Sequence, residues 1–247
     1  MKGIYCFAGH RVEIDSIFPR VHELCELYRS DGYPEYAVRT TRDDIDFERE
    51  RSDAESRFEE REPPRCPDAY LETLAVYRKL AECLLNENIL LFHGSAIAVD
   101  GIGYLFTAKS GTGKSTHTQL WREAFGTRAV MINDDKPFLE ITGEGVTVWG
   151  TPWDGKHRLS NNISAPLKAV CILERGEQNC IRPISVREAW PMLLQQSNRP
   201  QEADQLKKTI QLADALAHRV PLYRLHCNMS PDAVRTAWAG MNKGDRI

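Results

Sequence analysis

The chain has 247 residues with 32 basic and 35 acidic side chains, which gives a formal net charge of −3. About 150 residues make one domain, so this length suits one large domain or one domain with a small lobe. The pI of about 6.2 argues against broad electrostatic capture of nucleic acid. No apolar run reaches the ~18 residues of a membrane span, and residues 1–6 lack the apolar region of a signal peptide. Seven scattered cysteines without a CxxC pair favour reduced thiols, so we expect a cytoplasmic protein that binds neither nucleic acid nor membrane.

Residues 1–67 are expected to form a small N-terminal α+β lobe that could recognise a substrate. Residues 3–12 mix apolar, aromatic and small side chains as a short strand does, and residues 17–28 have apolar positions at helical or mixed spacing. Residues 43–62 are dense in charge, with more acids than arginines, which predicts a solvated strand–loop or helix face. A binding surface for a basic partner is the alternative interpretation of this segment.

Prolines at 63, 64 and 67 end the charged segment and place the start of a second domain at residue 68. Residues 68–88 form the clearest amphipathic helix, with leucines and alanines at i, i+3, i+4 and i+7 spacing. The later pattern predicts an α/β domain over 68–247 with a mixed β-sheet and flanking helices. Strands are expected at 89–92, 96–99, 103–107, 129–132, 138–141, 146–149, 167–174, 181–184 and 221–227, and helices at 116–125, 186–194, 201–219 and 231–241.

A glycine-rich motif carries the strongest chemical signal. Residues 108–116 match the phosphate-binding pattern GxxxxGK[ST], except that Ala108 replaces the first glycine. Gly111 and Gly113 would let the backbone curl so that its N–H groups face phosphate oxygens. Lys114 would reach the β- and γ-phosphates, and the Ser115 hydroxyl would bind Mg²⁺. The expected nucleotide-binding residues are therefore Ser110, Gly111, Thr112, Gly113, Lys114, Ser115 and Thr116.

Two carboxylates, Asp134 and Asp135, follow the apolar strand expected at 129–132. Acidic residues at the end of a buried strand near such a loop are typical of a nucleotide-associated metal site. Two adjacent carboxylates also allow one to face the metal and the other to face a substrate hydroxyl. His93 precedes the hairpin that leads to the glycine loop, and a histidine can relay a proton near neutral pH.

This order of motifs resembles the catalytic domain of the HPr kinase/phosphorylase family, which is related to the phosphoenolpyruvate carboxykinase nucleotide-binding fold. The resemblance covers His93-Gly94, the glycine loop and Asp134-Asp135, within residues 89–175. It implies that Asp134, assisted by His93, deprotonates the acceptor hydroxyl, that Lys114 acts on the phosphates, and that Ser115 and Asp135 bind Mg²⁺. The two aspartates could exchange these roles. The chain departs from the family in having Thr116 where an acidic residue is typical and in its different N-terminal segment.

Residues 150–158 differ from the family signature and resemble those of small HPr-kinase-like proteins, some of them linked to peptide-tailoring gene clusters. Turn residues alone would make this a plain surface loop. As a substrate loop, it offers Lys156 and Arg158 to neutralise charge on a transferring phosphoryl group and Asp154 to contact metal or substrate. Arg199, flanked by Pro200, is a further candidate phosphate clamp.

The sequence thus predicts a kinase that uses ATP and Mg²⁺ to phosphorylate a hydroxyl, with a serine of a peptide or protein favoured as acceptor. A small-molecule kinase for free serine or a polyol is the first alternative. A non-catalytic nucleotide sensor and a carboxykinase-type lyase on the same fold are the others. The sequence leaves the acceptor, the nucleoside preference and homo-oligomer formation open.

Overall fold

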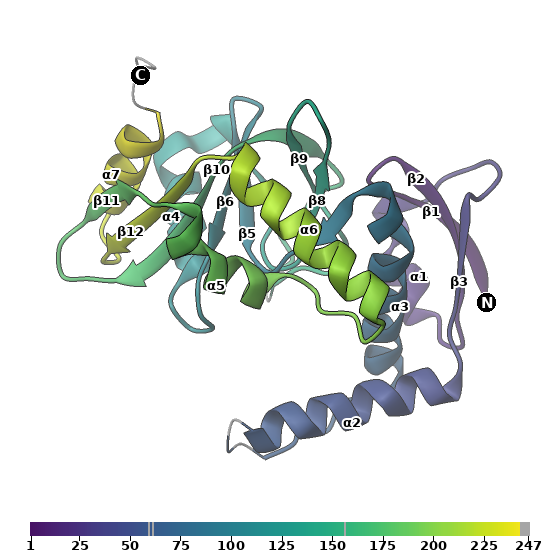
Figure 1. The fold of residues 1–247 in the computed structure, drawn as a ribbon. Coiled ribbons are helices and arrows are strands. Elements are labelled where there is room, and N and C mark those ends of the chain that lie inside the picture. Colours follow the sequence, from purple (N-terminus) through teal and green to yellow (C-terminus); the bar gives the residue numbers. More distant parts are fainter. Residues whose placement is uncertain (59, 61, 156, 243–247) are drawn as a thin grey trace. The chain divides into compact units, whose positions relative to one another are not determined.

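The chain divides into two compact units, Met1–Leu84 and Leu85–Ile247. The computed structural model describes residues 1–58, 60, 62–155 and 157–242, and Figure 1 gives the labels of the elements. The boundary predicted between residues 67 and 68 thus lies before the division between the two compact units. The difference arises because helix α3, Asp68–Leu84, packs within the first unit.

A small sheet with the strand order β1-β2-β3 forms part of the first unit. Residues 3–12, expected as one strand, instead belong to an antiparallel hairpin of β1 (Lys2–Phe7) and β2 (His10–Asp15). The chain reverses at Ala8 and Gly9, whose φ angles are 47° and 86°. Strand β3 (Tyr36–Arg39) pairs with β2 in parallel. The short helices α1 (Arg20–Leu24) and η1 (Glu26–Tyr28) connect β2 to β3.

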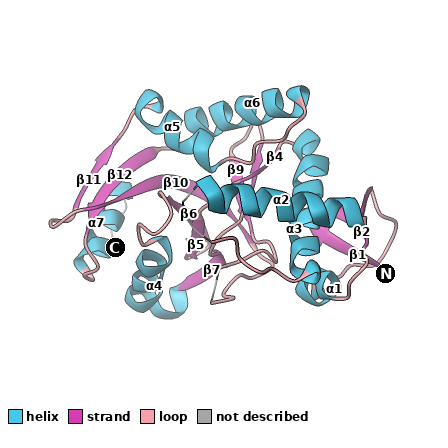
Figure 2. Ribbon diagram, turned by 90° about the horizontal axis from the view of Figure 1, so that it is seen from below, coloured by secondary structure: helices cyan, strands magenta, loops and turns pink. Residues whose placement is uncertain are grey.

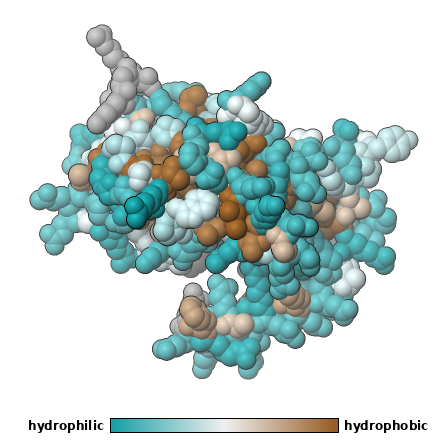
Figure 3. Space-filling model, viewed as in Figure 1, coloured by the Kyte–Doolittle hydropathy of each residue, from teal (hydrophilic) through white to brown (hydrophobic). Residues whose placement is uncertain are grey.

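Helix α2, Arg42–Phe58, contains most of the charged segment, so the helix-face interpretation is confirmed. The face of α2 visible in Figure 3 is largely hydrophilic. On its packed side, the buried Glu48 accepts a hydrogen bond of 2.7 Å from Arg78 of α3. Glu72 of α3 is fully buried and accepts bonds from the N–H groups of Ile17 and Phe18 at 2.6 and 2.8 Å. These bonds tie α3 to the elements before it.

The second unit is built around a mixed sheet, which has nine strands within the described residues. Its main path runs β4-β8-β9-β10-β6-β5-β7, with β12 beside β10 and β11 beside β12. The long strand β10 pairs in parallel with β6 and β12, and its first residues pair antiparallel with β9. The strands are β4 (Ile89–Leu91), β5 (Ser95–Val99), β6 (Ile102–Thr107), β7 (Ala129–Asn133), β8 (Phe138–Ile141), β9 (Val146–Trp149), β10 (Ser164–Arg175), β11 (Cys180–Pro183) and β12 (Leu222–Cys227). The predicted mixed α/β class is confirmed.

Helices cover both faces of this sheet, as Figure 2 shows. Alternate residues of the central strands point to opposite faces, so Leu105 joins the core under α5 and α6 while Phe106 joins the core under α4 and α7. The helices are α4 (Lys114–Phe125), α5 (Val186–Gln196), α6 (Ala203–Arg219) and α7 (Asp232–Met241), with the short η2 (Leu85–Glu87) and η3 (Gly126–Arg128). Among the described residues, no helix combines the length and apolar character needed to cross a bilayer.

Candidate functional site

The glycine loop lies between the end of β6 and the start of α4. Gly111 has a φ of 73° and Gly113 a φ of 114°, values that favour glycine over residues with a side chain. Gly113 directly precedes Lys114, the first residue of α4, and its carbonyl accepts the first helical bond from His117 N at 2.9 Å. The N–H groups that precede this bond have no partner within a helix, and the positive end of the helix dipole lies there. The loop therefore presents donors suited to an anion.

The side chain of Lys114 lies over the glycine loop. Its Nζ atom is 3.5 Å from the carbonyl oxygen of Ala108. Burial lowers the pKa of Lys114 below its usual value, although the negative charge of Asp135 opposes this shift. An anionic ligand in the loop would replace part of the lost solvation.

The predicted loop residues thus occupy one turn of chain and the first turn of α4. Thr112 N donates to Lys109 O at 3.2 Å, which closes the turn around Ser110 and Gly111. Thr116 is half-buried in the first turn of α4. Arg175, at the end of β10, was not predicted as a site residue. Its Nη2 atom donates a 2.6 Å hydrogen bond to the Gly111 carbonyl oxygen.

The acidic pair follows β7 and is held by a residue that the sequence analysis overlooked. Asn133 is fully buried, and its Oδ1 atom accepts bonds from the N–H groups of Asp135 and Lys136 at 2.8 and 2.5 Å. Its Nδ2 atom donates to the Thr151 carbonyl oxygen at 3.0 Å. Asn133 therefore fixes the turn that carries the acidic pair and joins it to the segment after β9. Its place directly before two acids at a strand end was the available signal.

Asp134 is 4% exposed and faces the start of β5. Its Oδ1 atom accepts a 2.7 Å hydrogen bond from Ser95, whose hydroxyl is also 3.0 Å from Thr118 Oγ1 of α4. On its other side, a Cβ atom added to Gly155 would lie 2.8 Å from Asp134 Oδ2. Asp134 is thus held between β5, α4 and the loop after β9.

Asp135 pairs with His93. The distance from His93 Nε2 to Asp135 Oδ1 is 3.1 Å, and about a third of each side chain is exposed. Burial alone would raise the pKa of the Asp135 carboxyl. The hydrogen bond from His93 and the charges of Lys136 and Lys114 outweigh that effect and lower the pKa below its usual value. The carboxyl group of Asp135 is therefore held in its ionised form while part of its side chain stays open to solvent.

The backbone of His93 is fixed on both sides. Its N–H donates to Gln196 O at 2.8 Å, and its carbonyl accepts from Thr107 Oγ1 at 3.1 Å. Asn198 N also donates to Leu91 O at 3.0 Å, so the segment that ends in the exposed Arg199 runs beside His93.

The other predicted substrate residues lie in the segment after β9. Asp154 Oδ2 accepts from Ser160 N at 3.4 Å, and burial raises the pKa of the Asp154 carboxyl. Arg158 is exposed and has a φ of 49°, an unusual conformation for a residue with a side chain. Lys156 lies outside the described residues.

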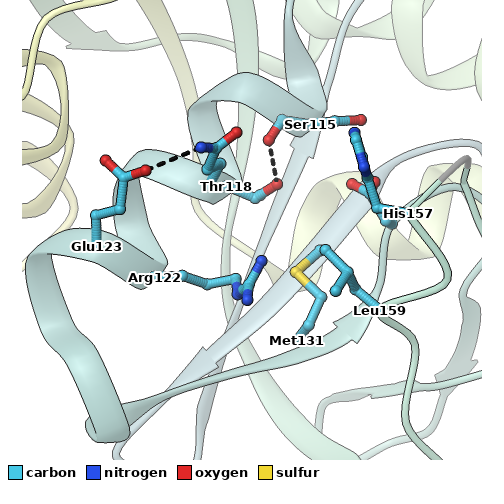
Figure 4. Close-up of a pocket in the computed structure, with 9 residues that line it drawn as sticks. Ser115, Thr118, Arg122, Glu123, Met131, His157 and Leu159 are labelled. Atoms are coloured by element: carbon cyan, nitrogen blue, oxygen red, sulfur yellow. Dashed lines mark hydrogen bonds between the residues drawn. The ribbon is translucent and has the colours of Figure 1, made fainter.

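A cleft of about 510 Å³ opens beside Ser115 and Asp134. Figure 4 shows one wall made by α4, where Ser115 lies at one end and Arg122 and Glu123 lie further along the helix. The opposite wall comes from β7 and the segment after β9, and it includes Met131, His157 and Leu159. Thr118 and Gln119 complete the α4 wall. His93 and Asp135 do not belong to this lining, so the two aspartates face different surroundings.

The fold and site define an α/β protein in which a glycine loop and an acidic pair meet at one end of a mixed sheet. Residues 71–235 match the family described as "SynChlorMet cassette protein ScmC", about two thirds of the chain, and the chain belongs to this family. A solved structure of the Hpr(Ser) kinase/phosphatase from Coxiella burnetii is similar over 60% of this chain and 89% of its own, with 12% identity and a TM-score of 0.35. The comparison with curated proteins returned no match.

Proposed function

We propose that this protein transfers the γ-phosphoryl group of ATP to a hydroxyl in a Mg²⁺-dependent reaction. The observation that carries the proposal is the pairing of His93 with Asp135 at 3.1 Å. The pair lies near the glycine loop, because the charge of Asp135 acts on the pKa of Lys114. A base with a fixed partner beside an anion-binding loop suits phosphoryl transfer to a hydroxyl. The name of the matched family states no reaction.

The nucleotide's phosphates would bind at the glycine loop. The N–H groups at the start of α4 and the loop would donate to phosphate oxygens, and Lys114 would contact the β- and γ-phosphates. Arg175 would act as a positioning residue, because its hydrogen bond to Gly111 O ties the loop to the end of β10.

Ser115 and Asp134 fit a Mg²⁺ ion, because both line the same cleft and both carry oxygen atoms, the ligands that Mg²⁺ prefers. In the described residues no group of three or more His, Cys, Asp or Glu side chains could hold a metal alone. A Mg²⁺ ion bound to nucleotide phosphates needs only one or two protein carboxylates. When bound, it would neutralise charge on the β- and γ-phosphates. Asp134 here takes the metal role that the sequence analysis gave to Asp135.

Asp135 would act as the base, with His93 as its partner. Its carboxylate accepts the proton of the acceptor hydroxyl while that oxygen forms a bond to the γ-phosphorus. The bond from this phosphorus to the β,γ-bridging oxygen breaks, and ADP leaves. Asp134 suits this step less well, because it is 4% exposed and already accepts a bond from Ser95. A base of this kind typically contributes about 10²–10⁴-fold.

The acceptor we favour is a serine of a peptide or protein, on the family resemblance alone. Arg199 is a candidate for contact with the acceptor, since its segment runs beside His93 through the bond from Asn198 N to Leu91 O. Arg158 and Asp154 remain candidates for contacts with the phosphoryl group or acceptor. Lys156 remains a candidate on its sequence position alone.

Transfer from [γ-³²P]ATP with Mg²⁺ to serine peptides, proteins, free serine and polyols tests the proposal. We expect one acceptor class to be labelled by the wild-type protein. Asp135→Asn should lose about 10²-fold or more in rate and still bind ADP, whereas Lys114→Ala should lose ADP binding as well. Asp214→Asn, an exposed carboxyl on α6, is the matched control and should behave as wild type. ADP binding without labelling of any acceptor would contradict a kinase and favour a nucleotide sensor. A larger rate loss in Asp134→Asn than in Asp135→Asn, with Mg²⁺ affinity intact, would overturn our choice of base.

A further inference from the structure

The cleft beside α4 begins at the proposed metal site and continues away from it. Ser115 lies at one end of its α4 wall and Glu123 at the other, and Asp134 also belongs to the lining. Eight residues of α-helix separate Ser115 from Glu123, which corresponds to about 12 Å at 1.5 Å per residue. A ligand that begins at the phosphates could therefore extend along this helix.

We propose that this cleft binds the nucleoside part of the nucleotide, an inference that rests on the proposed kinase function. In an in-line transfer, the acceptor and the leaving oxygen lie on opposite sides of the γ-phosphorus. Under the proposed function, the acceptor side is the side of the paired His93 and Asp135, because Asp135 would contact the hydroxyl. Asp134 faces the cleft instead. The leaving ADP, and hence its nucleoside, belongs on the cleft side.

The chemistry of the outer cleft suits a base and a ribose. Met131 and Leu159 form an apolar surface, and Figure 4 shows the Arg122 side chain directed toward them. A planar base between an aliphatic wall and a guanidinium gains apolar contact and a cation–π interaction. Glu123 is exposed, and one of its carboxylate oxygens accepts a 2.9 Å hydrogen bond from Gln119. A carboxylate has several acceptor sites, so Glu123 can also accept bonds from ribose hydroxyls. The volume of about 510 Å³ lies within the usual range of small-molecule sites.

The experiment compares the binding of ADP and of inorganic pyrophosphate to the full chain by titration calorimetry with Mg²⁺. Pyrophosphate reports on the glycine loop alone, and ADP reports on the loop together with the nucleoside site. We expect ADP to bind the wild-type protein at least about tenfold more tightly than pyrophosphate, which corresponds to ~1.4 kcal/mol.

Arg122→Ala and Glu123→Gln are the informative variants because they remove opposite charges. Each should weaken ADP binding about fivefold or more and change pyrophosphate binding less than twofold, since each removes a contact to the nucleoside. Arg235→Ala, which removes an exposed arginine on α7, is the matched control and should change neither ligand. Circular dichroism checks that both cleft variants are folded.

Three results would overturn the inference. ADP affinity could stay unchanged in both variants, or it could fall together with pyrophosphate affinity. It could also fall in one variant and rise in the other, as long-range electrostatics predicts for the removal of opposite charges. Failure of the proposed function has a separate readout. No acceptor would be labelled in the transfer assay, or pyrophosphate would not bind the wild-type protein or would bind Lys114→Ala equally well.

Discussion

The Nε2 atom of His93 lies 3.1 Å from Oδ1 of Asp135, whereas the neighbouring Asp134 accepts its hydrogen bond from Ser95. Two carboxylates that are adjacent in the chain thus have different partners, different exposure and different neighbouring spaces. This separation is the basis for giving them different roles.

The His93–Asp135 pair predicts a change in pH dependence when His93 is removed. His93→Ala loses the hydrogen bond that lowers the pKa of Asp135, while the burial that raises it remains. The carboxylate would then accept protons at higher pH, so the acid side of the transfer-rate profile should move to higher pH. The profile of kcat/KM against pH measures this shift.

His218→Ala, which removes an exposed histidine on α6, is the control for this profile and should leave it unchanged. A uniform fall in rate with an unmoved acid side would show that His93 does not act through Asp135.

A substitution at Gly155 can displace the Asp134 carboxylate while Asp134 itself stays unchanged. In Gly155→Ala the added Cβ atom would lie 2.8 Å from Asp134 Oδ2, too close for a normal contact, so the carboxylate must move. We expect weaker Mg²⁺-dependent ADP binding and little change in binding without the metal. Gly143→Ala is the matched control, because its Cβ atom meets nothing within 4 Å. Equal binding by the two variants would contradict a metal role for Asp134.

Removal of the Asn133 side chain is expected to lower the stability of the folded protein. Asn133→Ala removes the acceptor for two N–H groups and the donor to Thr151 O in a fully buried position. Unpaired buried groups cost about 1–3 kcal/mol each, so urea unfolding should show a loss of roughly 3 kcal/mol. Asn179→Ala removes hydrogen bonds at a partly exposed position and should cost less than about 1 kcal/mol. A loss in Asn133→Ala as small as that of this control would mean that Asn133 does not fix the turn.

His117 predicts acid sensitivity of the folded state. Burial lowers its pKa from 6.5 to about 4, and its Nε2 atom accepts a 3.0 Å bond from Trp121. The unfolded chain binds a proton at this residue below pH 6.5 and the folded chain does not, so stability falls as pH drops from 6.5 toward 4. The expected loss at pH 5 is about 2 kcal/mol.

His117→Gln keeps an acceptor for Trp121 and cannot titrate, so its urea midpoint should fall less between pH 7.5 and pH 5. Equal falls in the variant and the wild type would assign the acid sensitivity to other groups.

The secondary structure followed closely from local patterns. Alternating and helical apolar spacing located the strands and helices of the second unit to within a few residues, because these periods reflect which side chains face a core. The charged segment was harder, since its few apolar residues fitted a strand–loop or a helix face, and the structure shows α2. The hairpin within residues 3–12 was missed because its turn includes Ala8 at a positive φ, and alanine is not a residue type that indicates such a turn.

The sequence by itself determined the glycine loop, the acidic pair and the histidine before the hairpin, because each depends on residues that are adjacent in the chain. Only the tertiary structure decided that His93 pairs with Asp135, that Ser95 holds Asp134, and that α3 belongs with the first unit. Each of these contacts joins residues tens of positions apart. Such contacts depend on how strands and helices pack, and a local pattern carries no information about the partner across the sheet.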